Sequence, residues 1–220
     1  MSELYGPEQK PRSGGRPKQL VVLLHGLGSD GDDLIGLAPY FAEALPDAEF
    51  LSPHAPFDCD MAPFGRQWFS LQDRSPSSLY QGLAIARPIL DGFLDAALAE
   101  RGLANQDMLL VGFSQGTMLS LFTALRRPLA CAGILGYSGM LAAPDRLPAE
   151  IRSRPPVKLI HGDEDPVVPF EMMDLARQAL DVMEVPVSVE ERPHLGHSID
   201  DEGIASGIAF AKSCFGILQG

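Results

Sequence analysis

The sequence has few cysteines and no paired cysteine motif. It contains only three cysteines in 220 residues, Cys59, Cys131 and Cys214, with neither C-x-x-C spacing nor histidine partners nearby. A sparse and odd set of this kind argues against a disulfide framework and against a zinc site. It is typical of reduced thiols, so we expect a cytoplasmic protein.

Positive charge and long hydrophobic runs are also scarce. The chain has 17 basic and 29 acidic residues, a formal net charge of −12. This balance argues against nucleic-acid binding and against stable association with anionic membranes, since both use clustered Lys and Arg. No apolar stretch approaches the roughly 20 residues of a membrane span. Residues 1–18 lack the apolar core of a signal peptide, and we expect them to form a leader that is poorly ordered or follows an edge.

Short apolar runs alternate with longer helical patterns over residues 19–220, which predicts one α/β domain. This alternation favours a mostly parallel sheet with helices on both faces and leaves no segment for a separate lid domain. Pro88 predicts a kink or a division in one helix. The long irregular segment 53–77 contains the only tryptophan, Trp68, and such loops are often functional. The expected strands are 19–25, 48–52, 107–113, 130–137, 157–161 and 185–191, and the expected helices are 33–44, 78–101, 114–126, 170–183 and 203–215.

A G-x-S-x-G pentapeptide, with Ser114 at its centre, lies where an apolar strand passes directly into a helix. This setting is typical of a nucleophile elbow, in which the serine adopts a strained backbone conformation and the glycines allow close packing. The alternative is an ordinary serine cap at the start of a helix.

An acid and a histidine follow Ser114 in the order that a serine triad on this kind of sheet requires. Asp165 is the expected acid because Pro166 stiffens the chain beside it, whereas Asp163 is expected to support the turn and Glu164 to face solvent. His197 is the expected base, preferred over His194. For any one of these residues, the alternative is a polar side chain on a surface loop.

Glycine-rich sequence after the first long strand predicts a cradle for a negatively charged reaction intermediate. In His-Gly-Leu-Gly, residues 25–28, the glycines allow the N–H of Leu27 to face the site. The N–H of Gln115, directly after the serine, supplies the second donor. Because both donors belong to the backbone, the side chains of Leu27 and Gln115 are expected to be free to vary. The alternative is a plain glycine turn.

Four segments together, LLHGLGSDGDDLIGLA, GFSQGTMLSL, HGDEDPVVP and HLGHSID, resemble the bacterial phospholipase/carboxylesterase family of α/β hydrolases, which includes the acyl-protein thioesterases. The resemblance covers nearly all of the chain from about residue 18. It implies an α/β-hydrolase fold, ester hydrolysis without cofactor or metal, the triad Ser114, Asp165 and His197, and an oxyanion hole at Leu27 and Gln115. One departure is Met140, where acyl-protein thioesterases often carry Trp.

The sequence thus predicts a serine carboxylesterase acting on small, largely apolar and uncharged esters. Lysophospholipase, acyl-protein thioesterase, amidase or peptidase activity, and a non-catalytic binding protein, remain as alternatives. Trp68, Met140 and Val167 are the candidate walls of the substrate pocket, and Trp68 serves equally well as a packing anchor. A homodimer is left open.

Overall fold

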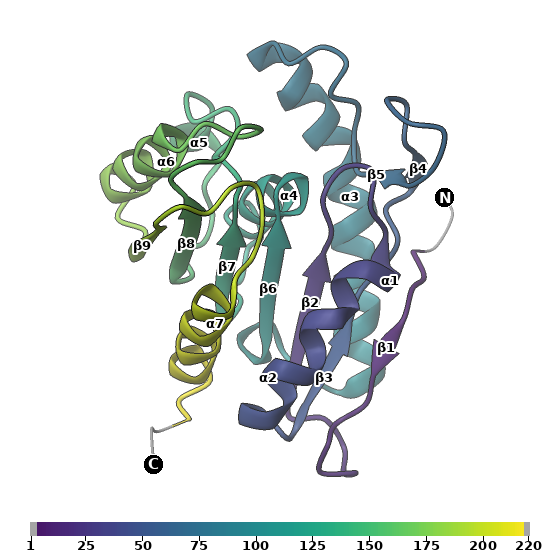
Figure 1. Ribbon diagram of the computed structural model, residues 1–220. Coiled ribbons are helices and arrows are strands. Elements are labelled where there is room, and N and C mark those ends of the chain that lie inside the picture. Colours follow the sequence, from purple (N-terminus) through teal and green to yellow (C-terminus); the bar gives the residue numbers. More distant parts are fainter. Residues whose placement is uncertain (1–3, 218–220) are drawn as a thin grey trace.

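The computed structural model describes residues 4–217 and contains a seven-stranded sheet (Figure 1). Its strand order is β1-β3-β2-β6-β7-β8-β9, and every pairing is parallel except that of β1 with β3. The sheet is therefore mostly parallel, as expected. Its strands are β1 (Glu8–Gln9), β2 (Gln19–Leu24), β3 (Ala48–Leu51), β6 (Met108–Phe113), β7 (Gly133–Tyr137), β8 (Val157–Gly162) and β9 (Val187–Arg192).

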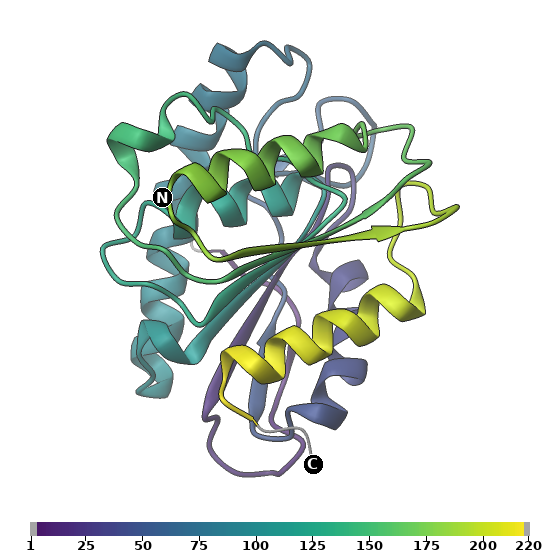
Figure 2. The ribbon, with the colours of Figure 1, turned by 90° about the vertical axis from the view of Figure 1, so that its left-hand side faces the viewer.

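Helices cover both faces of the sheet, as Figure 2 shows. One face carries α3 (Pro76–Arg101), α4 (Gln115–Ala124) and α6 (Glu171–Val182), and the other carries α1 (Gly31–Leu34), α2 (Ala38–Ala44) and α7 (Asp201–Cys214). Two hydrophobic clusters result, one on each side. The described part of the chain has no separate lid domain.

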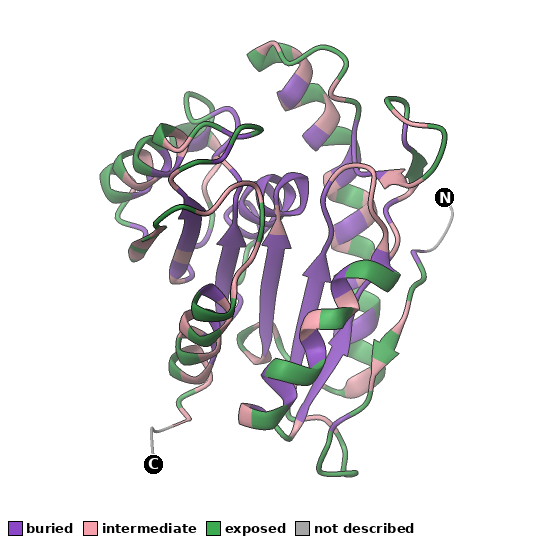
Figure 3. Cartoon of the chain, viewed as in Figure 1, coloured by how far each residue is buried: buried purple, intermediate pink, exposed green. Residues whose placement is uncertain are grey.

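The central strands are buried on both faces (Figure 3). All residues of β7 are buried, and β2 is buried except at its first residue. Strands covered on both sides read as continuous apolar runs, which is why these runs predicted strands so well. The parallel arrangement also brings the carboxyl ends of β2, β6, β8 and β9 to one edge, where ligands bind in such sheets.

The largest departure from the expected elements is the helix predicted over 33–44. It divides into α1, a 3-10 turn (Ile35–Leu37) and α2, with Pro39 in the first turn of α2. A proline has no N–H and clashes with the preceding turn of a continuous helix, but it fits the first turn of a new one. Pro88, by contrast, lies inside α3, which is one helix of 26 residues rather than two.

The sequence prediction also missed three short strands and one short helix. β1 pairs with β3 at the sheet edge, so residues 4–18 run beside the sheet before β2. A hairpin of β4 (Phe57–Asp58) and β5 (Arg66–Gln67) lies within the long segment 53–77, and α5 (Leu147–Glu150) follows β7. No helix among the described residues is both long and apolar enough to cross a membrane.

Candidate active site

Ser114 occupies a sharp turn between β6 and α4. Its backbone has φ 53° and ψ −114°, a conformation that is unfavourable for a side-chain-bearing residue. The flanking glycines make the turn possible: a Cβ on Gly116 would lie 1.8 Å from the Leu24 carbonyl oxygen, and one on Gly112 would lie 2.4 Å from the Thr117 nitrogen. The Ser114 hydroxyl makes no hydrogen bond within residues 4–217 and faces a cavity. This is the strained elbow that the pentapeptide predicted.

Asp165 and His197 meet above the sheet edge from the loops after β8 and β9. The Asp165 Oδ2 atom lies 2.7 Å from His197 Nδ1, while Oδ1 accepts hydrogen bonds from the N–H groups of Val167 and Val168. Burial acts to raise the pKa of Asp165, but these hydrogen bonds, chiefly that from His197, outweigh it and hold the pKa below its ordinary value. The carboxylate is thus ionised and fixed beside the imidazole.

His161, at the end of β8, is a further member of the site to which the sequence analysis gave no role. Its Nε2 atom lies 2.9 Å from the Val168 carbonyl oxygen and 3.2 Å from Asp165 Oδ2, and the ring is buried. A proton on Nε2 would therefore be donated to both acceptors, which fixes the Asp165 carboxylate and the loop that carries it. In the sequence, the only indication of this role was that His161 lies four residues before Asp165, at the end of the strand predicted over 157–161.

The competing acidic and histidine residues have other roles. Asp163 accepts a hydrogen bond from the His194 N–H at 2.7 Å and so supports the turn, as expected. The side chains of Glu164 and His194 are 63% and 86% exposed and pair with each other, whereas that of His197 is 17% exposed. Of His194 and His197, it is His197 that contacts Asp165 and lines the cavity that Ser114 faces.

Two backbone N–H groups remain free next to Ser114. Leu27 lines the cavity, and a Cβ on Gly26 would lie 3.4 Å from Ser114 Cβ, so this loop passes close to Ser114. Neither the Leu27 nor the Gln115 N–H donates a hydrogen bond within the described residues. Gln115 is also the first residue of α4, where the helix dipole favours negative charge.

Trp68 is not a cavity wall: its side chain is buried, with 1% exposed, and packs in the core. Its indole Nε1 donates to the His25 carbonyl oxygen at 2.9 Å, and its backbone N–H donates to Gln115 Oε1 at 2.9 Å. Gln115 Nε2 in turn donates to the Phe69 carbonyl oxygen at 2.7 Å. The Gln115 side chain is therefore not free to vary, because with Trp68 it joins the Leu27 loop to α4.

His25 is buried and held at both ring nitrogens. Its Nδ1 lies 2.8 Å from the Gly26 carbonyl oxygen, and its Nε2 accepts a hydrogen bond from the Ala55 N–H at 3.0 Å. Burial lowers the pKa of His25, so the ring is neutral with its proton on Nδ1. This tautomer satisfies both contacts and stiffens the strand end before Leu27.

The cavity in front of Ser114 has a volume of about 480 Å³. Met140 and Val167, two of the three expected walls, line it, and Val167 is 48% exposed at its rim. Most of the other walls are aliphatic or thioether side chains, so the cavity suits an acyl chain. Besides Ser114, Leu27 and His197, the lining residues are Leu71, Arg74, Leu79, Met118, Met140, Val167, Val168, Pro169 and Met172.

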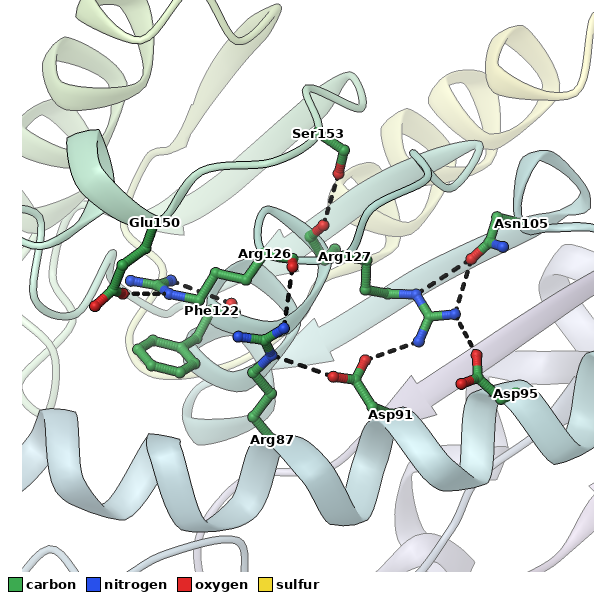
Figure 4. Close-up of polar contacts among 10 residues, drawn as sticks. Arg87, Asp91, Asp95, Asn105, Phe122, Arg126, Arg127, Glu150 and Ser153 are labelled. Atoms are coloured by element: carbon green, nitrogen blue, oxygen red, sulfur yellow. Dashed lines mark hydrogen bonds and ion pairs between the residues drawn. The ribbon is translucent and has the colours of Figure 1, made fainter.

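Buried arginines hold the far end of α4 (Figure 4). Arg126 donates from Nε to Glu150 at 2.7 Å, and Arg127 donates from Nη1 to Asp91 of α3 at 2.7 Å. Arg87 of α3 donates to the Arg126 carbonyl oxygen at 3.0 Å. These contacts pair the cations and place positive charge near the helix C-terminus, where it is stabilising. They therefore fix the C-terminal end of α4, whose N-terminal end directly follows Ser114.

One group of side chains in the described chain has metal-like spacing: ligand atoms of Asp30, Asp32 and His54 lie within 4.8 Å of one another. Structural contacts account for two of them. Asp30 caps α1 through the Asp33 N–H, and His54 Nδ1 accepts a hydrogen bond from the Gly31 N–H at 3.2 Å. We assign no metal to this cluster.

The chain is similar to proteins named esterase and acyl-protein thioesterase. Over 187 residues the chain is 27% identical to esterase YpfH of Escherichia coli K12, covering 85% of this chain and 79% of that protein. It is 27% identical to acyl-protein thioesterase 1 of Schizosaccharomyces pombe, covering 89% of this chain and 91% of the relative. The crystal structure of esterase PE8 superposes with a TM-score of 0.92 at 41% identity, covering 97% of this chain and all of that one.

A family model described as phospholipase/carboxylesterase matches residues 11–215. This match spans the elbow, both loops of the Asp165–His197 pair and every strand of the sheet except β1. The architecture is accordingly the α/β-hydrolase fold that the four sequence segments implied. The chain belongs to the phospholipase/carboxylesterase family.

Proposed function

We propose that this protein is a serine carboxylesterase in which Ser114, His197 and Asp165 act as nucleophile, base and orienting acid. The observation that carries the proposal is that Ser114 and His197 open into one apolar cavity while Asp165 holds the imidazole at 2.7 Å. A hydrolase of esters is also what the family and the named esterase relatives favour.

In the proposed mechanism, neutral His197 removes the proton of Ser114 as its Oγ attacks the acyl carbonyl carbon. Asp165 stabilises the resulting imidazolium. The free N–H groups of Leu27 and Gln115 bind the oxyanion of the tetrahedral intermediate. His197 then protonates the departing alcohol, and a water molecule repeats the sequence on the acyl-enzyme to release the acid.

The decisive test compares the wild type with Ser114→Ala. We expect the wild type to hydrolyse p-nitrophenyl esters and to be labelled by a fluorophosphonate probe, and the variant to lose both properties. A matched control is Ser120→Ala, which changes a buried serine within α4 whose hydroxyl donates to the Gly116 carbonyl oxygen. Labelling retained in Ser114→Ala would show that another residue is the nucleophile.

Hydrolysis of long acyl chains, as thioesters or lysophospholipids, is the second candidate function. A neighbouring cavity of about 520 Å³ shares Leu79, Met140 and Met172 with the one that Ser114 faces. Methionine side chains adapt their shape easily, so a shift of Met140 and Met172 would join the two apolar spaces. Relatives named acyl-protein thioesterase also favour this candidate.

A panel of substrates separates these functions. Its members are p-nitrophenyl esters from acetate to palmitate, a palmitoyl thioester and lysophosphatidylcholine, each compared by kcat/KM. A carboxylesterase of small esters shows its maximum at short chains, whereas a thioesterase or lysophospholipase favours the long ones.

A further inference from the structure

Arg74 is the one permanently charged side chain among the residues that line the cavity of Ser114 and His197. It forms no ion pair and no side-chain hydrogen bond within residues 4–217, so its guanidinium is free to bind a ligand. The Arg74 side chain is exposed to solvent, and it is an unpaired cation on a cavity whose other walls are largely apolar. In such surroundings a guanidinium interacts with an anion more strongly than it does in bulk water.

The backbone on both sides of Arg74 is fixed, and its nearest acidic neighbour is otherwise engaged. Asp73 accepts hydrogen bonds from the Ser75 N–H at 2.8 Å and from the Ser78 hydroxyl at 2.6 Å, at the start of α3. The Asp73 carboxylate is thus directed to the helix end and forms no ion pair with Arg74 among the described residues. Leu71 and Leu79, on either side in the chain, line the same cavity.

The geometry points to Arg74 as a specificity-determining residue that selects esters carrying an oxyanion, a carboxylate or a phosphate, on the part of the substrate held in the cavity. This inference rests on the proposed function of Ser114 and His197. It reverses the preference for uncharged esters that the net charge of −12 suggested. Charges further away than about 8–10 Å are screened at physiological salt, so a guanidinium on the cavity wall acts on a bound anion more strongly than acidic residues elsewhere on the surface do.

The test measures the ratio of kcat/KM for an anionic ester to that for its neutral counterpart. One pair carries the charge on the acyl side: the p-nitrophenyl half-ester of suberic acid against the p-nitrophenyl ester of its monoamide. The other carries it on the alcohol side: a lysophosphatidic acid against the monoacylglycerol with the same chain. The variants are Arg74→Gln and Arg74→Lys. Arg16→Gln is the matched control, because Arg16 is an exposed arginine before β2, at the opposite edge of the sheet from Ser114.

We expect Arg74→Gln to lower this ratio about three- to tenfold for at least one pair, the size of one charge-assisted hydrogen bond at a partly exposed site. Arg74→Lys should recover part of the loss, and Arg16→Gln should keep the wild-type ratio. The pair that responds identifies the side of the ester that carries the oxyanion.

The dependence of this ratio on salt concentration is an independent test of the attraction to Arg74. For the wild type, added NaCl should lower the ratio, because it screens the attraction to Arg74; for Arg74→Gln it should leave or raise the ratio, because only repulsion remains. Equal ratios in the wild type and Arg74→Gln for both pairs would overturn the inference. Failure of the proposed function would look different, as ester turnover that survives in Ser114→Ala.

Discussion

Replacing Trp68 by Phe tests whether the segment between β5 and α3 positions the oxyanion donors. The indole N–H holds the His25 carbonyl, two residues before Leu27, and the backbone N–H of Trp68 binds the Gln115 side chain. Phe keeps an aromatic ring and the backbone contact but removes the indole donor. The change should therefore loosen the Leu27 loop while leaving the triad side chains intact.

The magnitude follows from burial. A buried carbonyl left without its partner costs about 1–3 kcal/mol, and the smaller ring adds about 1–2 kcal/mol of lost packing. In a domain of this size, a total of about 2–5 kcal/mol corresponds to a fall in Tm of roughly 4–20 °C. Misplacement of one oxyanion donor should lower kcat about 10- to 100-fold with little change in KM, because the donor acts mainly in the transition state.

The assay measures kcat and KM on p-nitrophenyl butyrate at 20 °C, below unfolding, with Tm from circular dichroism. Phe50→Leu is the control: Phe50 of β3 is fully buried and belongs to the hydrophobic cluster on the other face of the sheet, so its loss should lower Tm without lowering kcat. If Trp68→Phe loses stability as Phe50→Leu does but keeps the wild-type kcat, the positioning role is refuted.

Four other changes have defined outcomes. Asp165→Asn should lower kcat about 1,000- to 10,000-fold with unchanged far-UV circular dichroism, because the amide no longer stabilises the imidazolium; a loss below tenfold would contradict its role. Met140→Trp should lower kcat/KM for octanoate and longer p-nitrophenyl esters relative to acetate by about tenfold, since the ring fills the cavity; an unchanged chain-length profile would place the acyl chain elsewhere. Because burial lowers the pKa of His25, the unfolded chain binds its proton more readily, so the unfolding free energy in urea should fall as pH drops below about 6.5, and less so in His25→Gln. Burial raises the pKa of Cys131 to about 11 and that of Cys214 to about 12, so iodoacetamide at pH 8 should alkylate them only in urea, as mass spectrometry of the peptides would report.

Local patterns predicted the features that depend on neighbouring residues. The run before Ser114 is a buried strand, and the glycines around it are required by contacts of 1.8–2.4 Å, so the elbow was readable from five residues. The order of Asp165 and His197 after later strands was readable as well, because parallel strands deliver successive loops to the same edge.

Contacts between distant segments were not readable. Trp68 was a candidate wall because it lies in an irregular loop, yet its side chain is fixed by His25, 43 residues earlier, and its backbone by Gln115, 47 residues later. The division of the helix predicted over 33–44 is a second example. The spacing of its apolar residues predicted one continuous helix, but a new helix begins there with Pro39 in its first turn.

The sequence by itself determined the features on which the proposed chemistry rests: a serine elbow, an acid and a histidine that follow it in the chain, and a sheet that brings all three to one edge. The tertiary structure alone decided what surrounds that chemistry, including the roles of His161 and Gln115 and the unpaired charge of Arg74 in the cavity. The reason is physical. Strand and turn patterns are set by residues close together in the chain, whereas burial, ion pairing and cavity walls are set by side chains that meet only after the chain has folded.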